Sequence, residues 1–542
     1  MGFGSWRPFC MFSLSPKHHA GTEPSRTGSP PHGKRGGGKQ VKPIEIIFYG
    51  KARLENVPGL SVCVRRRAAR EASRERNWIM LEHEIHEECG VFGVYRQEEA
   101  ALLTYFGLHA LQHRGQEGAG IACADDRDIV CRKGCGLLTE VFHPGNLEDL
   151  QGHSCIGHVR YATAGGSELE NVQPLVARSF LGSVAVVHNG QIVNAPELRR
   201  ELEERGSIFR GTSDSEIILH LIQGGNGSLL EKITAACRRL EGAFSFLILT
   251  EKNLYAIRDK YGIRPLSIGR TSSGNWCVSS ETCAFSVINA SFVRDVKPGE
   301  IVKFTQSGAE SHFYTDDCDH RLCSMEYIYF SRPDSTLEGH SVHAVRKESG
   351  RMLARQENAH EFADIVVGVP DSSLSAAMGY SEESGLPQEM GLIKNKYTGR
   401  TFIQPTQKLR DLGVQMKLSA NQPVVKGKRI VLIDDSIVRG TTSRRIISLL
   451  RAAGAKEIHV RIAAPEMKYP CFYGVDTSTR RELASANYPT EELCRKLGAD
   501  SLRFLTEEQL RTACGGAHFC QACFSGNYVT PLYSYKKALE KA

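Results

Sequence analysis

Two adjacent carboxylates, Asp434 and Asp435, follow an apolar run at residues 429–433 and precede the small-residue loop "GTTS" at 440–443. Carboxylates at the end of a buried strand suit Mg²⁺ or the hydroxyls of a sugar. Hydroxyls and backbone amides at the start of the following helix suit a phosphate. The spacing differs from that of a P-loop. The alternative without a ligand is a solvated strand end followed by a helix cap.

This segment resembles the type I phosphoribosyltransferase signature. The resemblance implies that Asp434 and Asp435 contact the ribose hydroxyls of phosphoribosyl pyrophosphate (PRPP) and one magnesium ion per subunit. The loop and helix start would then hold the 5′-phosphate through Arg439, Gly440, Thr441, Thr442 and Ser443.

A second strand, loop and helix lies upstream in "VVGVPDSSLSAAMGY" and resembles the pyrophosphate-binding loop of the same family. Asp371 and Ser373 are its expected PRPP contacts, and Ser372 is expected beside the magnesium ion. The basic segment "KNKYTGRTFIQP" resembles the family's mobile flap, which closes over the substrate and excludes water. Its expected PRPP contacts are Lys394, Tyr397 and Arg400, and the alternative for each is a solvated loop side chain.

Cys89 in "HEECGVFG" stands at the start of a strand-like run, where a thiolate could act as a nucleophile. Such a nucleophile needs a base and an oxyanion hole. Asn189 and Gly190 in "VVHNGQIVNA" offer a side-chain amide and a backbone N–H for the oxyanion. Arg160 and Asp214 offer charges that pair with the carboxylate and the ammonium of glutamine. The alternative for Cys89 is a buried structural cysteine.

The base that activates this thiol is left open by the sequence. His113 in "QHRGQE" and His188 in "HNG" are candidates, and either could be structural. The alternative is the free α-amine of an N-terminal cysteine, whose pKa is about 8. That alternative requires cleavage before Cys89, so residues 80–88 would be a short propeptide.

Eight segments in one order carry a wider resemblance, to the glutamine phosphoribosylpyrophosphate amidotransferase family, from Cys89 to about Tyr533. They are "ECGVFG", "LHALQHRGQEGAGIA", "GHVRYATAGG", "HNGQIVNA", "TSDSE", "SMEYIYFSRPDS", "GLIKNKYTGRTFIQP" and "IDDSIVRGTTSRR". The resemblance implies an N-terminal-nucleophile (Ntn) hydrolase αββα sandwich, of the class II glutamine amidotransferase type, followed by a type I phosphoribosyltransferase α/β domain. It also implies the activity: ammonia from glutamine passes internally to PRPP and gives 5-phosphoribosylamine, pyrophosphate and glutamate, the first step of purine biosynthesis.

The chain has 17 cysteines and no convincing signal peptide, which favours reduced thiols used for chemistry or metal binding. Four of them could form one site: Cys323, Cys471, Cys520 and Cys523. By count, four thiolates suit zinc and a [4Fe–4S] cluster equally. The resemblance favours one [4Fe–4S] cluster per subunit, because the branch of the family with these ligand contexts also has the cleaved propeptide. Cys318 and Cys514 are nearby competitors.

Two kinds of element must position these residues. Short β-type runs separated by turns recur from residue 89 to about 313, with helical stretches at 98–115 and 195–206, and predict a sheet-rich α+β domain. From about residue 324, apolar strands alternate with helices and predict a parallel α/β sheet. The expected domains are a glutaminase domain at 89–322, a phosphoribosyltransferase domain at 323–500 and a helical tail with cluster ligands at 501–542.

The net charge of +7 comes from the N-terminal segment. Residues 1–79 hold 15 of the 68 Lys and Arg residues and 5 of the 61 Asp and Glu residues, which leaves 53 basic and 56 acidic residues in the remainder. We expect this Gly-, Pro- and Arg-rich segment to be disordered or wrongly assigned to the coding sequence, with Met80 the true start. The rest of the chain gives no argument for nucleic-acid binding, and it contains no run of about 18 apolar residues that would indicate a membrane span.

The resemblance further implies a cytoplasmic homotetramer that is inhibited by the purine nucleotides AMP, GMP, ADP and GDP. Two other functions are less compatible with the residues. A non-catalytic purine-sensing regulator would need a DNA-binding module and a degraded glutamine site. A sugar-phosphate aminating enzyme would carry an isomerase domain in place of the segment that contains "VLIDDSIVRGTTS".

Overall fold

The computed structural model describes residues 89–161, 168–179, 182–395, 418–477, 479–516, 519–536 and 539. The extension at 1–79, the expected propeptide at 80–88 and the flap residues Tyr397 and Arg400 lie outside the described residues. The described residues all belong to one compact unit of the chain.

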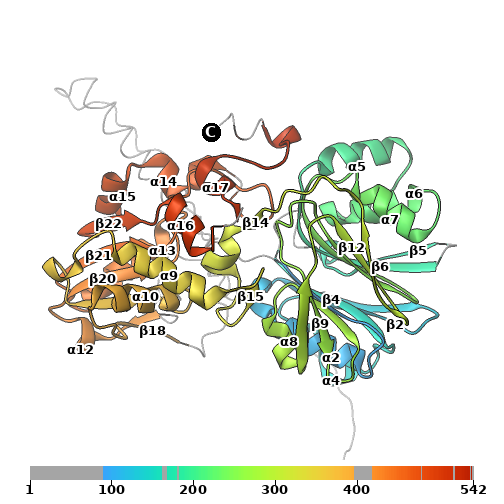
Figure 1. The fold of residues 1–542 in the computed structure, drawn as a ribbon, viewed down its shortest axis with the longest axis horizontal. Helices are drawn as coiled ribbons and strands as arrows, with labels where there is room; N and C mark the ends of the chain where they lie inside the picture. Colours follow the sequence, from blue (N-terminus) through green and yellow to red (C-terminus); the bar gives the residue numbers. More distant parts are fainter. Residues whose placement is uncertain are drawn as a thin grey trace, which may run out of the picture. The chain divides into compact units, whose positions relative to one another are not determined.

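Two antiparallel sheets form the first half of the described chain (Figure 1). The first sheet has the order β11-β9-β10-β1-β4-β2-β3. Its strands are β1 (Gly90–Val94), β2 (Gly118–Ala124), β3 (Ile129–Cys135), β4 (Ser154–Arg160), β9 (Ser267–Thr271), β10 (Trp276–Ser279) and β11 (Ala290–Asp295). The second sheet has the order β13-β12-β8-β7-β6-β5. Its strands are β5 (Leu175–Ser179), β6 (Gly182–Ile192), β7 (Gly242–Thr250), β8 (Leu254–Arg258), β12 (Glu300–Thr305) and β13 (Gly308–Phe313).

The two sheets pack face to face, and helices cover their outer faces. Alternate strand residues such as Val91 and Ile156 meet Val187 and Leu247 of the other sheet in one buried cluster. Helices α2 (Ala100–Ala110) and α8 (Cys283–Val287) pack on the first sheet. Helices α5 (Ala195–Glu204), α6 (Ile217–Gly224) and α7 (Leu229–Cys237) pack on the second. The four layers confirm the αββα sandwich expected from the sequence.

One cysteine pair differs from the expectation of reduced thiols. Cys123 on β2 and Cys155 on β4 face each other directly across the first sheet and form a disulfide. The register brings their Cα atoms to 4.1 Å.

The second half contains a parallel sheet in the order β17-β20-β21-β22. Its strands are β17 (Ile365–Gly368), β20 (Arg429–Asp434), β21 (Glu457–Ile462) and β22 (Ser501–Phe504). The helices of this half are α9 (Val342–Ala354), α10 (Leu374–Ser384), α12 (Gln422–Val425), α13 (Thr441–Ala452), α14 (Ala484–Asn487), α15 (Thr490–Leu497) and α16 (Glu507–Ala513). The last strand lies beyond the expected domain boundary at residue 500, so the sheet continues into the segment that we expected to be a helical tail.

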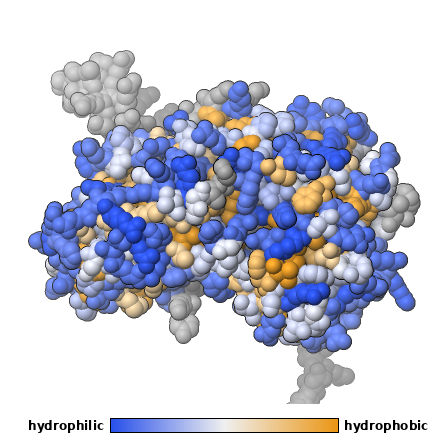
Figure 2. All heavy atoms as spheres, in the orientation of Figure 1, coloured by the Kyte–Doolittle hydropathy of each residue, from blue (hydrophilic) through white to orange (hydrophobic). Residues whose placement is uncertain are grey.

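Short elements join the ends of the second half. β14 (Leu322–Cys323) pairs in parallel with β23 (Phe519–Cys520), which is followed by α17 (Ala522–Ser525). The remaining short pairs are β15 (Thr336–Leu337) with β16 (His340–Ser341) and β18 (Leu392–Lys394) with β19 (Leu418–Ala420). No helix in the described ranges is long and apolar enough to cross a membrane. The face shown in Figure 2 is mostly hydrophilic, with separate hydrophobic patches.

Candidate active sites

The acid pair lies at the carboxyl end of β20, where Asp434 and Asp435 are 7% and 8% exposed. Their neighbours are mainly neutral donors: Ser373 Oγ donates to Asp434 at 3.2 Å, and Ser372 Oγ donates to Asp435. Burial, followed by the charge of Asp435, raises the pKa of Asp434 to about 8. Burial also raises the pKa of Asp435. Two buried carboxyls side by side at the end of a strand, with serine hydroxyls as hydrogen-bond donors, fit a divalent cation.

The serines come from the loop after β17, the strand beside β20. Gly368 and Ile433 are register partners, so the two strands end at the same edge of the sheet. The sequence therefore identified two loops that meet, although their residues are more than 60 positions apart. Asp371, at the edge of this site, forms an ion pair with Lys394, whose Nζ lies 2.7 Å from Asp371 Oδ2. Both side chains are largely exposed.

The loop after β20 leads into α13 through Gly440, whose φ of 77° is left-handed. Ser443 Oγ donates to Asp434 at 3.4 Å, which places the helix start beside the acid pair. Arg439 pairs with Glu482: its Nε donates to the Glu482 carboxylate at 3.1 Å, and both side chains are 8% exposed. The expected phosphate contact of Arg439 is therefore occupied by an ion pair in this structure.

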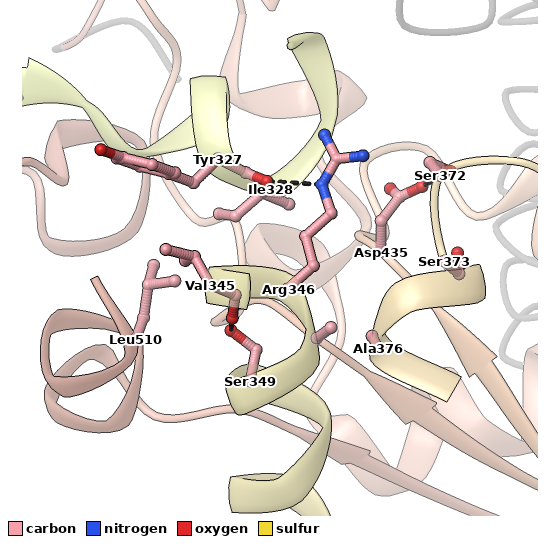
Figure 3. Close-up of a pocket in the computed structure, with 11 residues that line it drawn as sticks. Tyr327, Ile328, Val345, Arg346, Ser349, Ser372, Ser373, Ala376, Asp435 and Leu510 are labelled. Atoms are coloured by element: carbon pink, nitrogen blue, oxygen red, sulfur yellow. Dashed lines mark hydrogen bonds between the residues drawn. The ribbon is translucent and has the colours of Figure 1, made fainter. Parts of the chain in front are cut away.

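A small cavity lies beside Asp435 and is lined by a residue that sequence reasoning missed (Figure 3). Arg346 projects from α9, donating from Nε to the Tyr327 carbonyl at 2.6 Å and from Nη2 to the Ser331 carbonyl at 2.7 Å. Asp435 and Ser372 line the same cavity. The sequence feature that could have identified Arg346 is a charged residue on the buried face of α9, where apolar residues are expected. Ser436 Oγ, which donates to Asp435 at 2.6 Å, was missed as well.

The second candidate site lies in the αββα sandwich, where Cys89 directly precedes β1. Its Sγ donates to the Tyr161 carbonyl at 3.4 Å, one residue beyond Arg160 at the end of β4. Arg160 is 3% exposed and pairs in register with Gly118. Adjacent antiparallel strands therefore bring the thiol and the end of β4 together.

Asn189 and Gly190 lie on β6, in the other sheet. Asn189 is 1% exposed, and neither its amide nitrogen nor its amide oxygen has a hydrogen-bond partner. A buried amide without a partner carries a large desolvation penalty, and such groups in folded proteins often serve a ligand. Gly190 has φ 134°, and a Cβ there would lie 2.1 Å from the Ala243 carbonyl oxygen, so only glycine fits.

Asp214 lies close to this strand. Its Oδ2 accepts the Ile192 backbone N–H at 2.8 Å, so the carboxylate lies two residues beyond Gly190. Of the two histidine candidates, His113 bonds to the buried Glu281 carboxylate at 2.7 Å. His188 is buried, its Nδ1 bonds to Ser215 Oγ at 2.8 Å, and burial lowers its pKa.

The four expected cluster cysteines gather at one place. Cys323 and Cys520 are register partners of β14 and β23. Burial, followed by the neighbouring thiols of Cys323, Cys471 and Cys520, raises the pKa of Cys523 well above its ordinary value. In the described ranges, however, no three Cys, His, Asp or Glu side chains are spaced to hold a metal ion together.

The two competitor cysteines lie in other surroundings. Cys318 is exposed and donates to the Pro298 carbonyl at 3.3 Å. Cys514 is buried, and burial alone raises the pKa of its thiol to about 12. After burial, the largest effects on the pKa of Cys523 come from the thiols of Cys323, Cys471 and Cys520, which favours the expected set of four.

Comparison with known proteins finds a known domain in each half of the described chain. The chain matches a glutamine amidotransferase domain at residues 158–287 and a phosphoribosyl transferase domain at 342–470. It is 52% identical to amidophosphoribosyltransferase of Bacillus subtilis over 457 residues, which cover 83% of this chain and 95% of that protein. The chain belongs to the amidophosphoribosyltransferase family. Its activity is that of an amidophosphoribosyltransferase, which carries out the first step of purine biosynthesis.

Other members of the amidophosphoribosyltransferase family are similar to this chain in sequence and in structure. The enzyme of Staphylococcus epidermidis is 49% identical, over 84% of this chain and 94% of its own. A solved structure of the Bacillus subtilis enzyme, described as complexed with ADP and GMP, is 51% identical with a TM-score of 0.78, over 82% of this chain and 98% of that one. A second, described as the allosteric regulatory enzyme of purine biosynthesis, has a TM-score of 0.79 at 51% identity, over 82% of this chain and 97% of that one.

Proposed function

We propose that glutamine is hydrolysed at Cys89, with the Asn189 side-chain amide and the Gly190 N–H stabilising the tetrahedral oxyanion. The observation that carries this assignment is the buried Asn189 amide without a partner. A donor that is already desolvated and positioned needs no reorganisation when negative charge develops on the substrate. The Cys89 thiolate attacks the amide carbon, ammonia leaves, and water releases glutamate from the thioester.

We propose further that Arg160 and Asp214 bind the α-carboxylate and the α-ammonium of glutamine. The guanidinium of Arg160 would form a bidentate pair with the α-carboxylate, and the carboxylate of Asp214 would pair with the α-ammonium. Asp214 suits this role because its hydrogen bond to the Ile192 N–H fixes it beside the oxyanion strand. These two contacts set the affinity for glutamine, while Asn189 and Gly190 act on the transition state.

For the base, we favour the α-amine that cleavage before Cys89 would release. His113 is held by the Glu281 carboxylate, and His188 is buried with Nδ1 bonded to Ser215. Neither contact directs a ring nitrogen at Cys89. The proposed propeptide at 80–88 is tested by the intact mass of the purified protein, which should begin at Cys89.

For the phosphoribosyl donor, we propose that PRPP binds over the carboxyl edge of the parallel sheet. Asp434, Asp435 and Ser372 would hold Mg²⁺, on which family members depend for PRPP binding, and the bound ion would supply positive charge for the diphosphate leaving group. The 5′-phosphate would lie at the start of α13, on Gly440, Thr441, Thr442 and Ser443. Asp371, Ser373 and Lys394, with Tyr397 and Arg400, would hold the pyrophosphate. Arg439 would contact PRPP after releasing Glu482. Catalysis there is mainly positioning and charge stabilisation.

We further propose one [4Fe–4S] cluster on Cys323, Cys471, Cys520 and Cys523. Mutual proximity of the four thiols supports it, and ligand geometry would form as the metal binds, because binding of metal to thiols is linked to folding. The cluster would be structural, since it would tie the tail after β22 to β14. The protein would be a cytoplasmic homotetramer that AMP, GMP, ADP and GDP inhibit, as the ADP and GMP in the solved relative suggest.

A glutamine analogue with a diazoketone in place of the amide tests the glutaminase assignment. It should alkylate Cys89 and no other cysteine, as located by peptide mass spectrometry, and abolish glutamine-dependent activity. Alkylation elsewhere with Cys89 unmodified would reject the assignment.

A further inference from the structure

Arg114 is a fully buried arginine that contacts the backbone of Cys89. It ends the short helix η1 (Gln112–Arg114), and its Nε donates to the Cys89 carbonyl oxygen at 3.2 Å. The thiol of Cys89 donates to the Tyr161 carbonyl. The orientation of the nucleophile therefore depends on where the Arg114 side chain is held.

The guanidinium of Arg114 is held mainly by Glu326. Its Nη2 donates to Glu326 Oε1 at 2.7 Å, and its Nη1 donates to Glu326 Oε2 at 2.9 Å. The two residues form a bidentate ion pair in which both side chains are 0% exposed. Nη1 also donates to Glu281 at 2.7 Å, and Arg264 Nη1 lies 3.4 Å from Glu326. Burial alone would raise the pKa of Glu326, but Arg114 and Arg264 hold it below its ordinary value. The carboxylate is thus charged and fixed.

Glu326 does not belong to the αββα sandwich. It begins the π-helix η4 (Glu326–Phe330), whose Tyr327, Ile328 and Phe330 lie in the same buried cluster as the parallel sheet. Position 326 also lies between the two matched domain regions, 158–287 and 342–470. Ser331, directly after this helix, donates from Oγ to Glu326 Oε2 at 2.7 Å and so fixes the carboxylate from the same side.

We propose that Glu326 is a positioning residue for the glutaminase reaction, which acts through Arg114 to hold the Cys89 nucleophile from outside the glutaminase fold. This inference rests on the proposed role of Cys89. A buried ion pair contributes little net stability relative to apolar residues, so its value here lies in a fixed geometry. A nucleophile misplaced by a fraction of an ångström lowers the rate of attack more than it lowers substrate binding.

The test is Glu326→Gln, with glutamine hydrolysis and ammonia-dependent synthesis of phosphoribosylamine measured separately. We expect kcat for glutamine hydrolysis to fall at least about 10-fold, with KM for glutamine and the ammonia-dependent rate changed less than about twofold. The matched control is Glu357→Gln, which disrupts another buried arginine pair, with Arg461 Nη2 at 2.8 Å, that makes no contact with Cys89. This control should leave the ratio of the two activities unchanged.

A milder variant protects the test against failure to fold. Ser331→Ala removes one hydrogen bond to Glu326 and leaves the ion pair, so a selective fall of about threefold in glutamine kcat is expected. Unchanged glutamine kcat in a folded Glu326→Gln protein, or in Ser331→Ala if the first variant does not fold, would overturn the inference. Equal loss of both activities would overturn it too. Failure of the Cys89 assignment is distinguishable, because Cys89→Ser would then retain glutamine hydrolysis in an otherwise unchanged chain.

Discussion

Replacing Asp434 by asparagine should stabilise the protein at neutral pH when Mg²⁺ and PRPP are absent. The carboxyl is 7% exposed, and within the described ranges it receives hydrogen bonds from neutral groups: the hydroxyls of Ser373 and Ser443 and the Asp435 N–H. Burial and Asp435 raise its pKa to about 8, so the folded protein keeps a proton that the unfolded chain releases near pH 4.

The sign and size of the effect follow from proton linkage. Between about pH 4 and about pH 8 the carboxyl of Asp434 binds a proton in the folded state that it lacks in the unfolded state, so its contribution to stability falls as pH rises. The slope is about 1.4 kcal/mol per pH unit, or about 2.7 kcal/mol between about pH 5.5 and about pH 7.5. Asparagine at position 434 cannot titrate and should remove this contribution from the pH dependence.

The assay is urea unfolding of the wild type and Asp434→Asn at both pH values, without metal. The difference in slope between the two proteins isolates the carboxyl at 434 and its interaction with Asp435. Asp149→Asn is the control, since it removes an exposed carboxylate that pairs with Arg132 on the surface. Equal pH slopes in wild type and Asp434→Asn would refute the argument that this carboxyl is protonated in the unliganded protein.

Three further outcomes are expected. Asn189→Ala should lower glutamine-dependent kcat about 10²- to 10³-fold while ammonia-dependent synthesis survives, and steady-state kinetics with each nitrogen source checks this. Asp434→Asn combined with Asp435→Asn should abolish phosphoribosyl transfer yet leave some glutaminase capacity, whereas unchanged PRPP affinity would contradict the donor site. Protein prepared without air should contain iron and inorganic sulfide and lose both on Cys523→Ser, while bound zinc without iron would reject the cluster.

Residues that end apolar runs were predictable from the sequence, because a strand fixes where its last side chains lie. The acid pair after β20 and the serines after β17 meet for this reason, and Asn189 and Gly190 follow from the apolar part of β6 in the same way. The four layers followed from the resemblance, whereas the strand runs alone predicted a sheet-rich α+β domain.

Partners far apart in sequence were not predictable. Arg439 belongs to the phosphate loop by position, yet it pairs with Glu482, 43 residues away. Arg114 and Glu326 are 212 residues apart, and only the packed fold shows that they meet. β22 was assigned to the tail because only a helix and the cysteine-containing segment were expected beyond residue 500, whereas the strand pairs with β21. Side-chain charge alone does not specify a partner, so these contacts required the structure.

The most direct test of the two-site account is Cys89→Ser assayed with glutamine and with ammonia as nitrogen donors. The account predicts that glutamine-dependent synthesis of 5-phosphoribosylamine falls to background, because serine at this position lacks a comparable nucleophile. Ammonia-dependent synthesis should remain within about twofold of wild type, because the acid pair and its loops are untouched. Retained glutamine-dependent activity, or loss of both activities in a folded variant, would contradict it.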